Sequence, residues 1–251
     1  MVLGEVMKVS IIINILNSHE AVRRQILHFK RMNLPDDVEI LFIDDGSSPP
    51  LLSEEKLKNF TILYTNDKRP WTQGLARNMG AKFATGEYLM FTDVDHFYSK
   101  ECIEAVLSFT GDKMVFPRYY AYLDEDGNTI DDINKVLDFG LHPGRLTGRR
   151  GNSGGFHSNS FAMKREIFFR LGGYRESWCT GMMHQGKRKG EDSYFTWRYT
   201  KAAMSGVYTH QVTGPKMYVF PIGKFHKDGD LNPYGLFHGL SHEPVPQPML
   251  P

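Results

Sequence analysis

The stretch Tyr88-Leu89-Met90-Phe91-Thr92-Asp93-Val94-Asp95-His96 decides the fold, because an apolar run ends there in two carboxylates one residue apart. The apolar run predicts a buried strand, which would deliver Asp93 and Asp95 to its carboxyl-terminal end. Open α/β sheets bind their ligands in the crevice at that edge. Paired carboxylates there suit a hard divalent cation that bridges to the phosphates of a substrate. The alternative is a strand end that leads into a helix capped by Ser99.

The composition is typical of a soluble globular protein. A chain of 251 residues suffices for one large domain or two small ones. Its formal charge of +1 argues against a protein that binds nucleic acid through bulk charge. No apolar run approaches the roughly 20 residues of a membrane span, and the first residues do not resemble a secretory signal. The two cysteines, Cys102 and Cys179, are predicted to be free thiols in a reducing cytoplasm.

Strands and helices alternate through the first half of the chain. Predicted strands cover residues 9–16, 39–43, 61–64, 88–91 and 113–117, and predicted helices follow Ser18 and cover residues 72–84 and 100–109. The helix over 72–84 is expected to present Leu75, Met79 and Phe83 on one face and to be stopped by Gly86. This alternation predicts an α/β fold with a doubly wound, mostly parallel sheet and right-handed crossovers.

Beyond residue 118 the periodicity weakens. Short elements are predicted over residues 161–163, 165–171, 194–204, 207–208 and 216–220, separated by Gly-bearing loops at 139–156 and 178–190. We therefore predict a single domain over residues 1–242, with a nucleotide-binding half at about 8–118 and a loop-rich acceptor-binding half at about 119–242. The Pro-rich residues 243–251 are predicted to form an extended tail.

Four further features carry candidate chemistry, and each has a plain structural alternative. Asp44 and Asp45 form either an Asp-Gly turn or a carboxylate site for a base or ribose. Arg77 is either a solvated charge or the partner of a carboxylate or phosphate. Glu191-Asp192 is either an acidic pair favoured by a helix dipole or a general base with its neighbour. His226 is either a surface histidine or a metal ligand.

Five motifs occur in an order that resembles the family 2 inverting glycosyltransferases with the GT-A fold. They are Val9-Ser10-Ile11-Ile12-Ile13-Asn14, Asp44-Asp45-Gly46-Ser47, Gly74-Leu75-Ala76-Arg77-Asn78-Met79-Gly80, Thr92-Asp93-Val94-Asp95 and Gly190-Glu191-Asp192. Each motif is weak alone, but five in order with plausible spacing are specific. The resemblance covers roughly residues 8 to 200 and implies a Rossmann-like GT-A fold.

The C-terminal half is also similar to the β4-galactosyltransferases. The matching segments are Gly154-Gly155-Phe156, Phe161-Ala162-Met163-Lys164-Arg165, Leu171-Gly172-Gly173-Tyr174, Gly190-Glu191-Asp192, Lys224-Phe225-His226-Lys227-Asp228 and Asn232-Pro233. In that group the second Asp of the D-x-D motif and a later His bind manganese, which implies Asp95 and His226 here. The group's further Met ligand falls on Gly223, so water or Asp93 would fill that position. His157, His184, His210, His238 and His242 are alternatives to His226.

The resemblance implies a nucleotide-sugar donor, most simply a UDP-sugar, and Mn²⁺ or Mg²⁺ on its diphosphate. The residues implied at the donor are Asn14, Asp44, Asp45, Arg77, Asp93 and Trp178. Asp45 would read the uracil edge and Asp93 would lie near the ribose and the metal. Trp178 would stack on a sugar face, or alternatively pack in the core. Asp192 would be the catalytic base, and Glu191 would hold an acceptor hydroxyl or orient the loop.

The sequence therefore predicts a metal-dependent inverting glycosyltransferase that moves a hexose or N-acetylhexosamine from a UDP-sugar to a glycan or other hydroxyl acceptor. A carboxylate that takes the acceptor proton typically contributes about 10²–10⁴-fold in rate, and a cation neutralises the leaving diphosphate. The alternatives are a nucleotide-sugar hydrolase or nucleotidyltransferase, and a non-catalytic carbohydrate-binding protein. The chain lacks a Gly-rich, Lys-bearing phosphate loop near the first strand, which disfavours a nucleotidyltransferase.

Overall fold

The computed structural model describes residues 7–53, 57–67, 69, 72–138, 153–178 and 190–220. A central sheet of seven strands has the order β12-β6-β11-β4-β1-β2-β3. Its strands are β1 (Val9–Ile15), β2 (Val38–Asp44), β3 (Phe60–Tyr64), β4 (Tyr88–Asp93), β6 (Lys113–Val115), β11 (Phe161–Lys164) and β12 (Val212–Thr213). All neighbouring strands pair in parallel except at β11, which is antiparallel to both β4 and β6. The predicted mostly parallel α/β sheet is confirmed.

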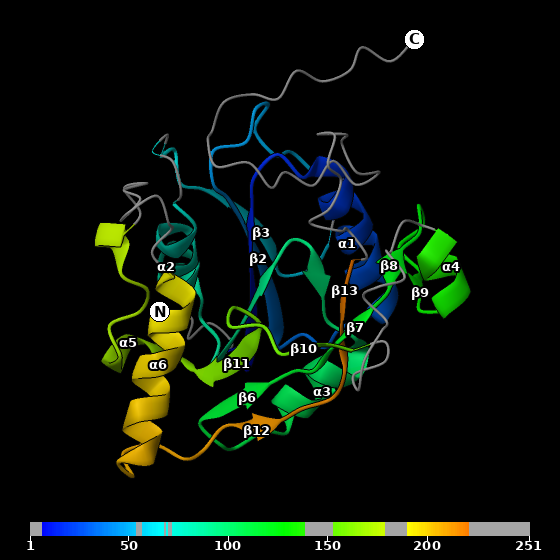
Figure 1. The fold of residues 1–251 in the computed structure, drawn as a ribbon. Coiled ribbons are helices and arrows are strands. Elements are labelled where there is room, and N and C mark those ends of the chain that lie inside the picture. The colour runs from blue at the N-terminus through cyan, green and yellow to red at the C-terminus, as the bar shows by residue number, and fades with distance from the viewer. Residues whose placement is uncertain are drawn as a thin grey trace.

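Helices cover both faces of this sheet (Figure 1). One face carries α1 (His19–Met32) and α3 (Lys100–Leu107), and the other carries α2 (Gln73–Phe83), α5 (Arg165–Arg170) and α6 (Glu191–Met204). Strand β1 is buried along its whole length. Its Ile11 and Ile13 pack with α1 and α3, whereas Ile12 packs with α2 and α6. A β-branched run thus suits a strand that is covered on both sides.

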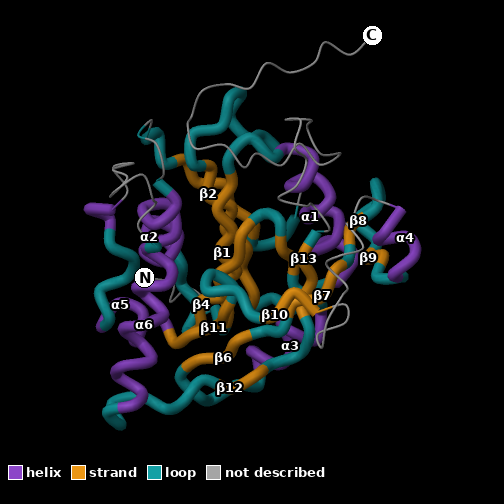
Figure 2. Tube along the Cα trace, in the orientation of Figure 1, coloured by secondary structure: helices purple, strands orange, loops and turns teal. Residues whose placement is uncertain are grey.

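A second sheet lies beside the first and was not predicted (Figure 2). Its order is β10-β7-β13-β5, formed by Ser153–Gly155, Arg118–Tyr120, Met217–Val219 and His96–Phe97. The smaller elements β8 (Tyr122–Leu123), β9 (Thr129–Ile130), α4 (Ile133–Asp138) and a 3₁₀ turn at Glu176–Trp178 complete the described elements. Because β5 follows β4 after two residues, the chain passes from one sheet to the other within the Asp-Val-Asp-His segment. The second sheet therefore borders the carboxyl end of β4.

Helix α2 presents a different face to the core from the predicted one. Its buried residues are Gly74, Ala76, Arg77, Asn78, Gly80 and Ala81. Phe83, which was expected to share an apolar face, is 58% exposed. The helix runs from Gln73 to Phe83 with Ala84 as its C-cap, which agrees with the predicted range 72–84, and Gly86 lies against the backbone of Ser10. Small side chains let α2 approach the sheet closely, and Arg77 lies on this same buried face.

Three smaller expectations have mixed outcomes. Ser99 caps α3 as predicted, since its side chain accepts a hydrogen bond from the backbone N–H of Cys102. Ser18 precedes α1 but does not cap it, because its hydroxyl donates to the carbonyl of Leu16 instead. The strand predicted at residues 207–208 is wrong: the chain turns there, and β12 comes later.

None of the described helices is both long enough and apolar enough to cross a membrane.

Replacing Gly80 with Ala is expected to lower the free energy of unfolding by about 1–3 kcal/mol. A Cβ atom at this position would lie 2.5 Å from Cγ2 of Ile12 and 3.1 Å from Cδ1 of Ile43, so the helix and the sheet must separate. Urea unfolding measures the change. The matched control is Lys82→Ala on the same helix, where the side chain is 64% exposed. Equal stability of Gly80→Ala and wild type would contradict the close packing.

Candidate active site

Polar side chains gather where the central parallel strands end, as the sequence predicts. Asn14 on β1 is in register with Asp93 on β4, and Asp44 ends the neighbouring strand β2. Asn14 is 6% exposed, and its side-chain oxygen has no hydrogen-bond partner. A buried amide oxygen without a partner is costly in a protein interior. This position therefore suits a ligand that donates a hydrogen bond.

The two acidic residues after β2 have different surroundings. Asp44 accepts hydrogen bonds from the backbone N–H groups of Ser47 and Leu51, both at 2.7 Å, so it builds the turn that the sequence offered as an alternative. Asp45 is buried and accepts from the hydroxyls of Thr72 at 2.7 Å and Thr65 at 3.2 Å. Burial raises the pKa of Asp45 to about 7, although both hydroxyls act in the opposite direction.

Replacing Asp45 with Asn is expected to change how stability depends on pH. A carboxyl whose pKa is raised in the folded state stabilises the protein only while it is protonated, so wild type loses stability as pH rises towards 7. The Asn variant cannot ionise, and it should gain about 2–3 kcal/mol relative to wild type between about pH 5 and about pH 8. Urea unfolding at both pH values measures the gain. Asp36→Asn, at a side chain that is 70% exposed, should show none.

Arg77 is among the largest fully buried side chains of the described residues and lies beneath the site. Its Nη2 donates to Oδ1 of Asp93, and its Nη1 lies 4.0 Å from Oε1 of Glu191. The guanidinium also lies over the ring of Tyr174, 5.3 Å from its centroid. Burial would raise the pKa of Asp93, but Arg77, His157 and His96 together outweigh it and hold that pKa below its usual value, with Arg77 the largest of the three. The alternative of a solvated surface charge at Arg77 is wrong.

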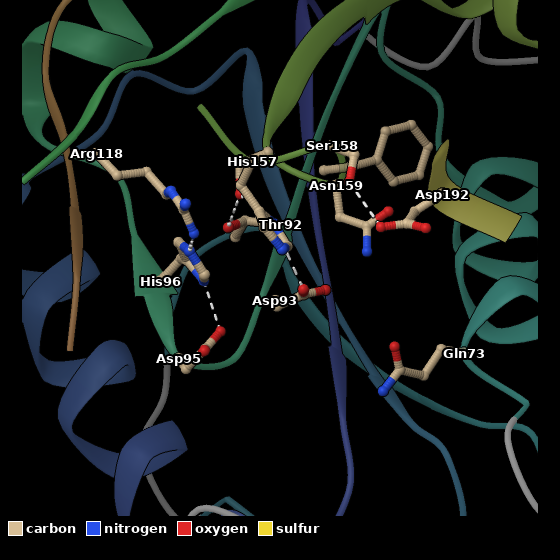
Figure 3. Close-up of polar contacts among 12 residues, drawn as sticks. Gln73, Thr92, Asp93, Asp95, His96, Arg118, His157, Ser158, Asn159 and Asp192 are labelled. Atoms are coloured by element: carbon tan, nitrogen blue, oxygen red, sulfur yellow. Dashed lines mark hydrogen bonds and ion pairs between the residues drawn. The ribbon is translucent and has the colours of Figure 1, made fainter. Parts of the chain in front are cut away.

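Asp93, His96 and His157 form a cluster with metal-ligating character (Figure 3). One ligand atom from each lies within 4.8 Å of the other two. His157 Nδ1 is 3.7 Å from Oδ2 of Asp93, and the two imidazole rings stack with centroids 4.7 Å apart. Burial lowers the pKa of His157 to about 4, which keeps the ring neutral. Neutral imidazole is the form that binds metals.

Asp95, predicted as a direct metal ligand, lies against His96. Its Oδ1 is 2.5 Å from Nδ1 of His96, and Nε2 of the same ring is 3.0 Å from Nη1 of Arg118. His226, Gly223 and the alternatives His184, His238 and His242 lie outside the described residues, and so does Cys179. His96 was not predicted as a ligand, although it directly follows the Asp-Val-Asp motif. His157 was predicted only as an alternative, and the exposed His210 is not part of this cluster.

Asp192 lies in the first turn of α6, on another side of the same region (Figure 3). Its Oδ2 accepts a hydrogen bond of 2.6 Å from the hydroxyl of Ser158, and its Oδ1 accepts from the backbone N–H of Ser193. Ser158 directly follows His157, so two neighbouring residues contact the two key carboxylates, Asp192 and Asp93. The site therefore has a cationic and imidazole-lined side and a separate carboxylate side.

Two other predicted residues lie beside α6. Glu191 is 4% exposed and faces Arg77, so its contact with Arg77 favours a role in holding the start of α6 in place. Trp178 ends the 3₁₀ turn and packs against the ring of Tyr194 at 5.0 Å and the guanidinium of Arg175 at 5.1 Å. These contacts place Trp178 at the first turns of α6, where the indole is partly exposed.

Two solved structures illustrate the fold that this chain shares with known proteins. Staphylococcus aureus TarS aligns with a TM-score of 0.53 and 15% identity, over 85% of this chain and 37% of that one. The mannosyltransferase PcManGT of Pyrobaculum calidifontis, in complex with GDP-Man and Mn²⁺, aligns with a TM-score of 0.53 and 18% identity, over 89% of this chain and 59% of that one. At such low identity the likeness concerns the fold alone.

Proteins related in sequence include several that are named as glycosyltransferases. The putative glycosyltransferase EpsH of Bacillus subtilis (strain 168) is 29% identical over 130 residues, which are 49% of this chain and 37% of the relative. An uncharacterized glycosyltransferase of Haemophilus influenzae is 29% identical over 143 residues, 52% of this chain and 55% of the relative. The alignments thus span little more than half of these relatives at most.

Residues 10–172 match the family described as Glycosyl transferase family 2. The chain belongs to glycosyl transferase family 2 and has its GT-A fold.

Proposed function

We propose that the protein is a metal-dependent inverting glycosyltransferase that moves a hexose or N-acetylhexosamine from a UDP-sugar to a glycan or other hydroxyl acceptor. The observation that carries the proposal is the separation of two carboxylates at one sheet edge. Asp93 lies among Arg77 and two imidazoles, whereas Asp192 receives a neutral hydroxyl from Ser158. Inverting transfer needs these two environments, one for the leaving diphosphate and one for the attacking hydroxyl.

The donor set of the cluster fits a divalent cation. Asp93, His157 and His96 offer one carboxylate and two imidazoles within mutual reach. Imidazole ligands favour Mn²⁺ over Mg²⁺, because Mg²⁺ prefers oxygen ligands and retained waters. A bound cation would neutralise negative charge on the diphosphate. Asp95 would then orient His96 through Nδ1, as carboxylates commonly do for metal-bound histidines. His226 remains the predicted additional ligand.

The donor end of the site supports a nucleotide. Asn14, near the end of β1, presents a buried oxygen without a partner, and Asp45, directly after the adjacent strand β2, presents a buried carboxylate. Both groups could accept the N–H of a base or a ribose hydroxyl. The sequence motifs by which the C-terminal half resembles the β4-galactosyltransferases are the reason for proposing UDP. The fold neighbour TarS has a structure in complex with UDP-GlcNAc, whereas PcManGT holds GDP-Man, so GDP is the competing donor nucleotide.

Asp192 would act as the general base. It sits in the first turn of α6, where the helix dipole favours an ionised carboxylate. The hydroxyl of Ser158 already donates to its Oδ2, which is the bond that an acceptor hydroxyl would make before transferring its proton. Glu191 is held near Arg77 and would position the start of α6 rather than take the proton.

Calorimetry of nucleotide binding tests the proposal. UDP, GDP and dTDP are titrated with and without Mn²⁺ into wild type and Asp93→Asn, with Asp36→Asn as an exposed carboxylate control. We expect UDP to bind wild type and the control only with Mn²⁺. For Asp93→Asn, we expect that adding Mn²⁺ does not increase the binding of UDP. Preference for GDP or dTDP would keep the enzyme class and change the donor. Absence of binding by every nucleotide would refute the proposal.

A further inference from the structure

Arg118, at the start of β7, lies on the opposite side of His96 from Asp95 (Figure 3). Its Nη1 lies 3.0 Å from Nε2 of His96. The other side of the guanidinium donates to the carbonyl of Gly155 from Nε at 3.2 Å and to the carbonyl of Phe156 from Nη2 at 3.4 Å. Arg118 therefore joins the metal-ligating cluster to the loop that carries His157.

The contacts of His96 determine what each ring nitrogen does. Nδ1 faces the carboxylate of Asp95 at 2.5 Å, and an ionised carboxylate can only accept, so Nδ1 carries the proton. In the neutral ring, Nε2 then has a lone pair, and the N–H of Arg118 uses it. That lone pair is also the group that a cation would need from His96. Arg118 and a cation therefore cannot share His96 in this tautomer.

We propose that Arg118 takes the place of the cation at His96 while the donor is absent. A divalent cation held by Asp93 and His157 displaces Nη1 from His96, and the released N–H donates to an oxygen of the diphosphate on that cation. The inference rests on the proposed function. The bonds to Gly155 and Phe156 keep the guanidinium in place during this exchange. A cation next to a released guanidinium is unfavourable until an anion arrives, so the cation and the diphosphate bind cooperatively.

Mn²⁺ binding without nucleotide is the first test, measured by the loss of the electron paramagnetic resonance signal of free Mn²⁺. Arg118→Met keeps an unbranched side chain but removes every donor. We expect this variant to bind Mn²⁺ about tenfold more tightly than wild type, because a charge-assisted hydrogen bond no longer competes for His96. Thermal unfolding of both proteins checks that the fold is kept.

Ionic strength separates the exchange from general charge repulsion. The titrations are repeated at about 0.05 M and about 0.5 M KCl, where longer-range repulsion between Arg118 and the cation is screened. Tighter binding by Arg118→Met at both concentrations supports the exchange at His96. A gain that disappears at high salt, or unchanged or weaker binding, overturns it. Weaker binding would mean that Arg118 only supports the loop of His157.

The second test measures the UDP affinity in saturating Mn²⁺. If the released guanidinium meets the diphosphate, Arg118→Met should bind UDP about tenfold more weakly than wild type. Equal affinities would overturn that part of the proposal. Failure of the proposed function is distinguishable, because wild type and variant would then both bind no Mn²⁺, with or without UDP.

Discussion

Replacing Asp192 with Asn should lower kcat for sugar transfer by about 10²–10⁴-fold, with the affinity for the donor nucleotide unchanged. The amide keeps the size of the side chain and can still accept from Ser158, but it cannot take a proton from the acceptor hydroxyl. Asp192 contacts Ser158 and Ser193, neither of which belongs to the cluster around Asp93. The loss should therefore fall on kcat, measured as UDP release in the presence of acceptor.

Two companion variants make the result specific. Ser158→Ala removes the hydroxyl that orients Asp192 and keeps the base, so its kcat should fall much less than that of Asp192→Asn. Asp36→Asn, at an exposed carboxylate paired with Lys58, should behave as wild type. Full activity in Asp192→Asn would move the base to another residue, and Glu191 would be the first to examine.

Arg77→Met should lower the free energy of unfolding by about 3–5 kcal/mol, the range for removing one partner of a buried ion pair. Arg77 is fully buried, and its loss leaves Asp93 and the nearly buried Glu191 without their nearest cation. The contact with the ring of Tyr174 is lost as well. Urea unfolding measures the effect, and Arg170→Met, at a side chain that is 62% exposed, is the matched control.

The pH dependence identifies the cause of this loss. Arg77 lowers the pKa of Asp93 in the folded state, so the pair stabilises the protein above the unfolded value near 3.8, and this is lost as pH falls through the lowered pKa. The stability difference between wild type and Arg77→Met should therefore shrink below about pH 4. A difference that does not change with pH would indicate lost packing, and a variant as stable as wild type would contradict the account of Arg77.

The central strands and their polar ends could be predicted because the signals are local. Apolar runs such as 9–15 and 88–91 are continuous, and the carboxylates follow them directly in the chain. The second sheet could not be predicted as a sheet. Only β13 lies in a predicted element, at residues 216–220, because strands of two or three residues show no periodicity. The buried face of α2 was missed because it consists of small residues and Arg77, which hydrophobic patterns do not detect.

Of the candidate site, only the residues that belong to a local sequence motif could be predicted. Asp93 was identified from its motif, but its contact with His157 depends on how distant segments fold together. The role of Asp95 depends on a contact with the next residue, His96, that spacing alone does not reveal. Ser158 carried no signal in the sequence beyond its position next to His157. The contacts of Arg77 with Asp93 and Glu191 likewise required the packing of α2 and α6.

The most direct test of the account is to locate Mn²⁺ by anomalous diffraction in crystals grown with Mn²⁺ and UDP. We expect one strong peak bound by Asp93, His96 and His157 and by oxygens of the diphosphate, with Asp192 free of metal contact. Bound UDP without a peak, or a peak whose ligands do not include Asp93, would contradict the assignment of this cluster as the metal centre of the enzyme.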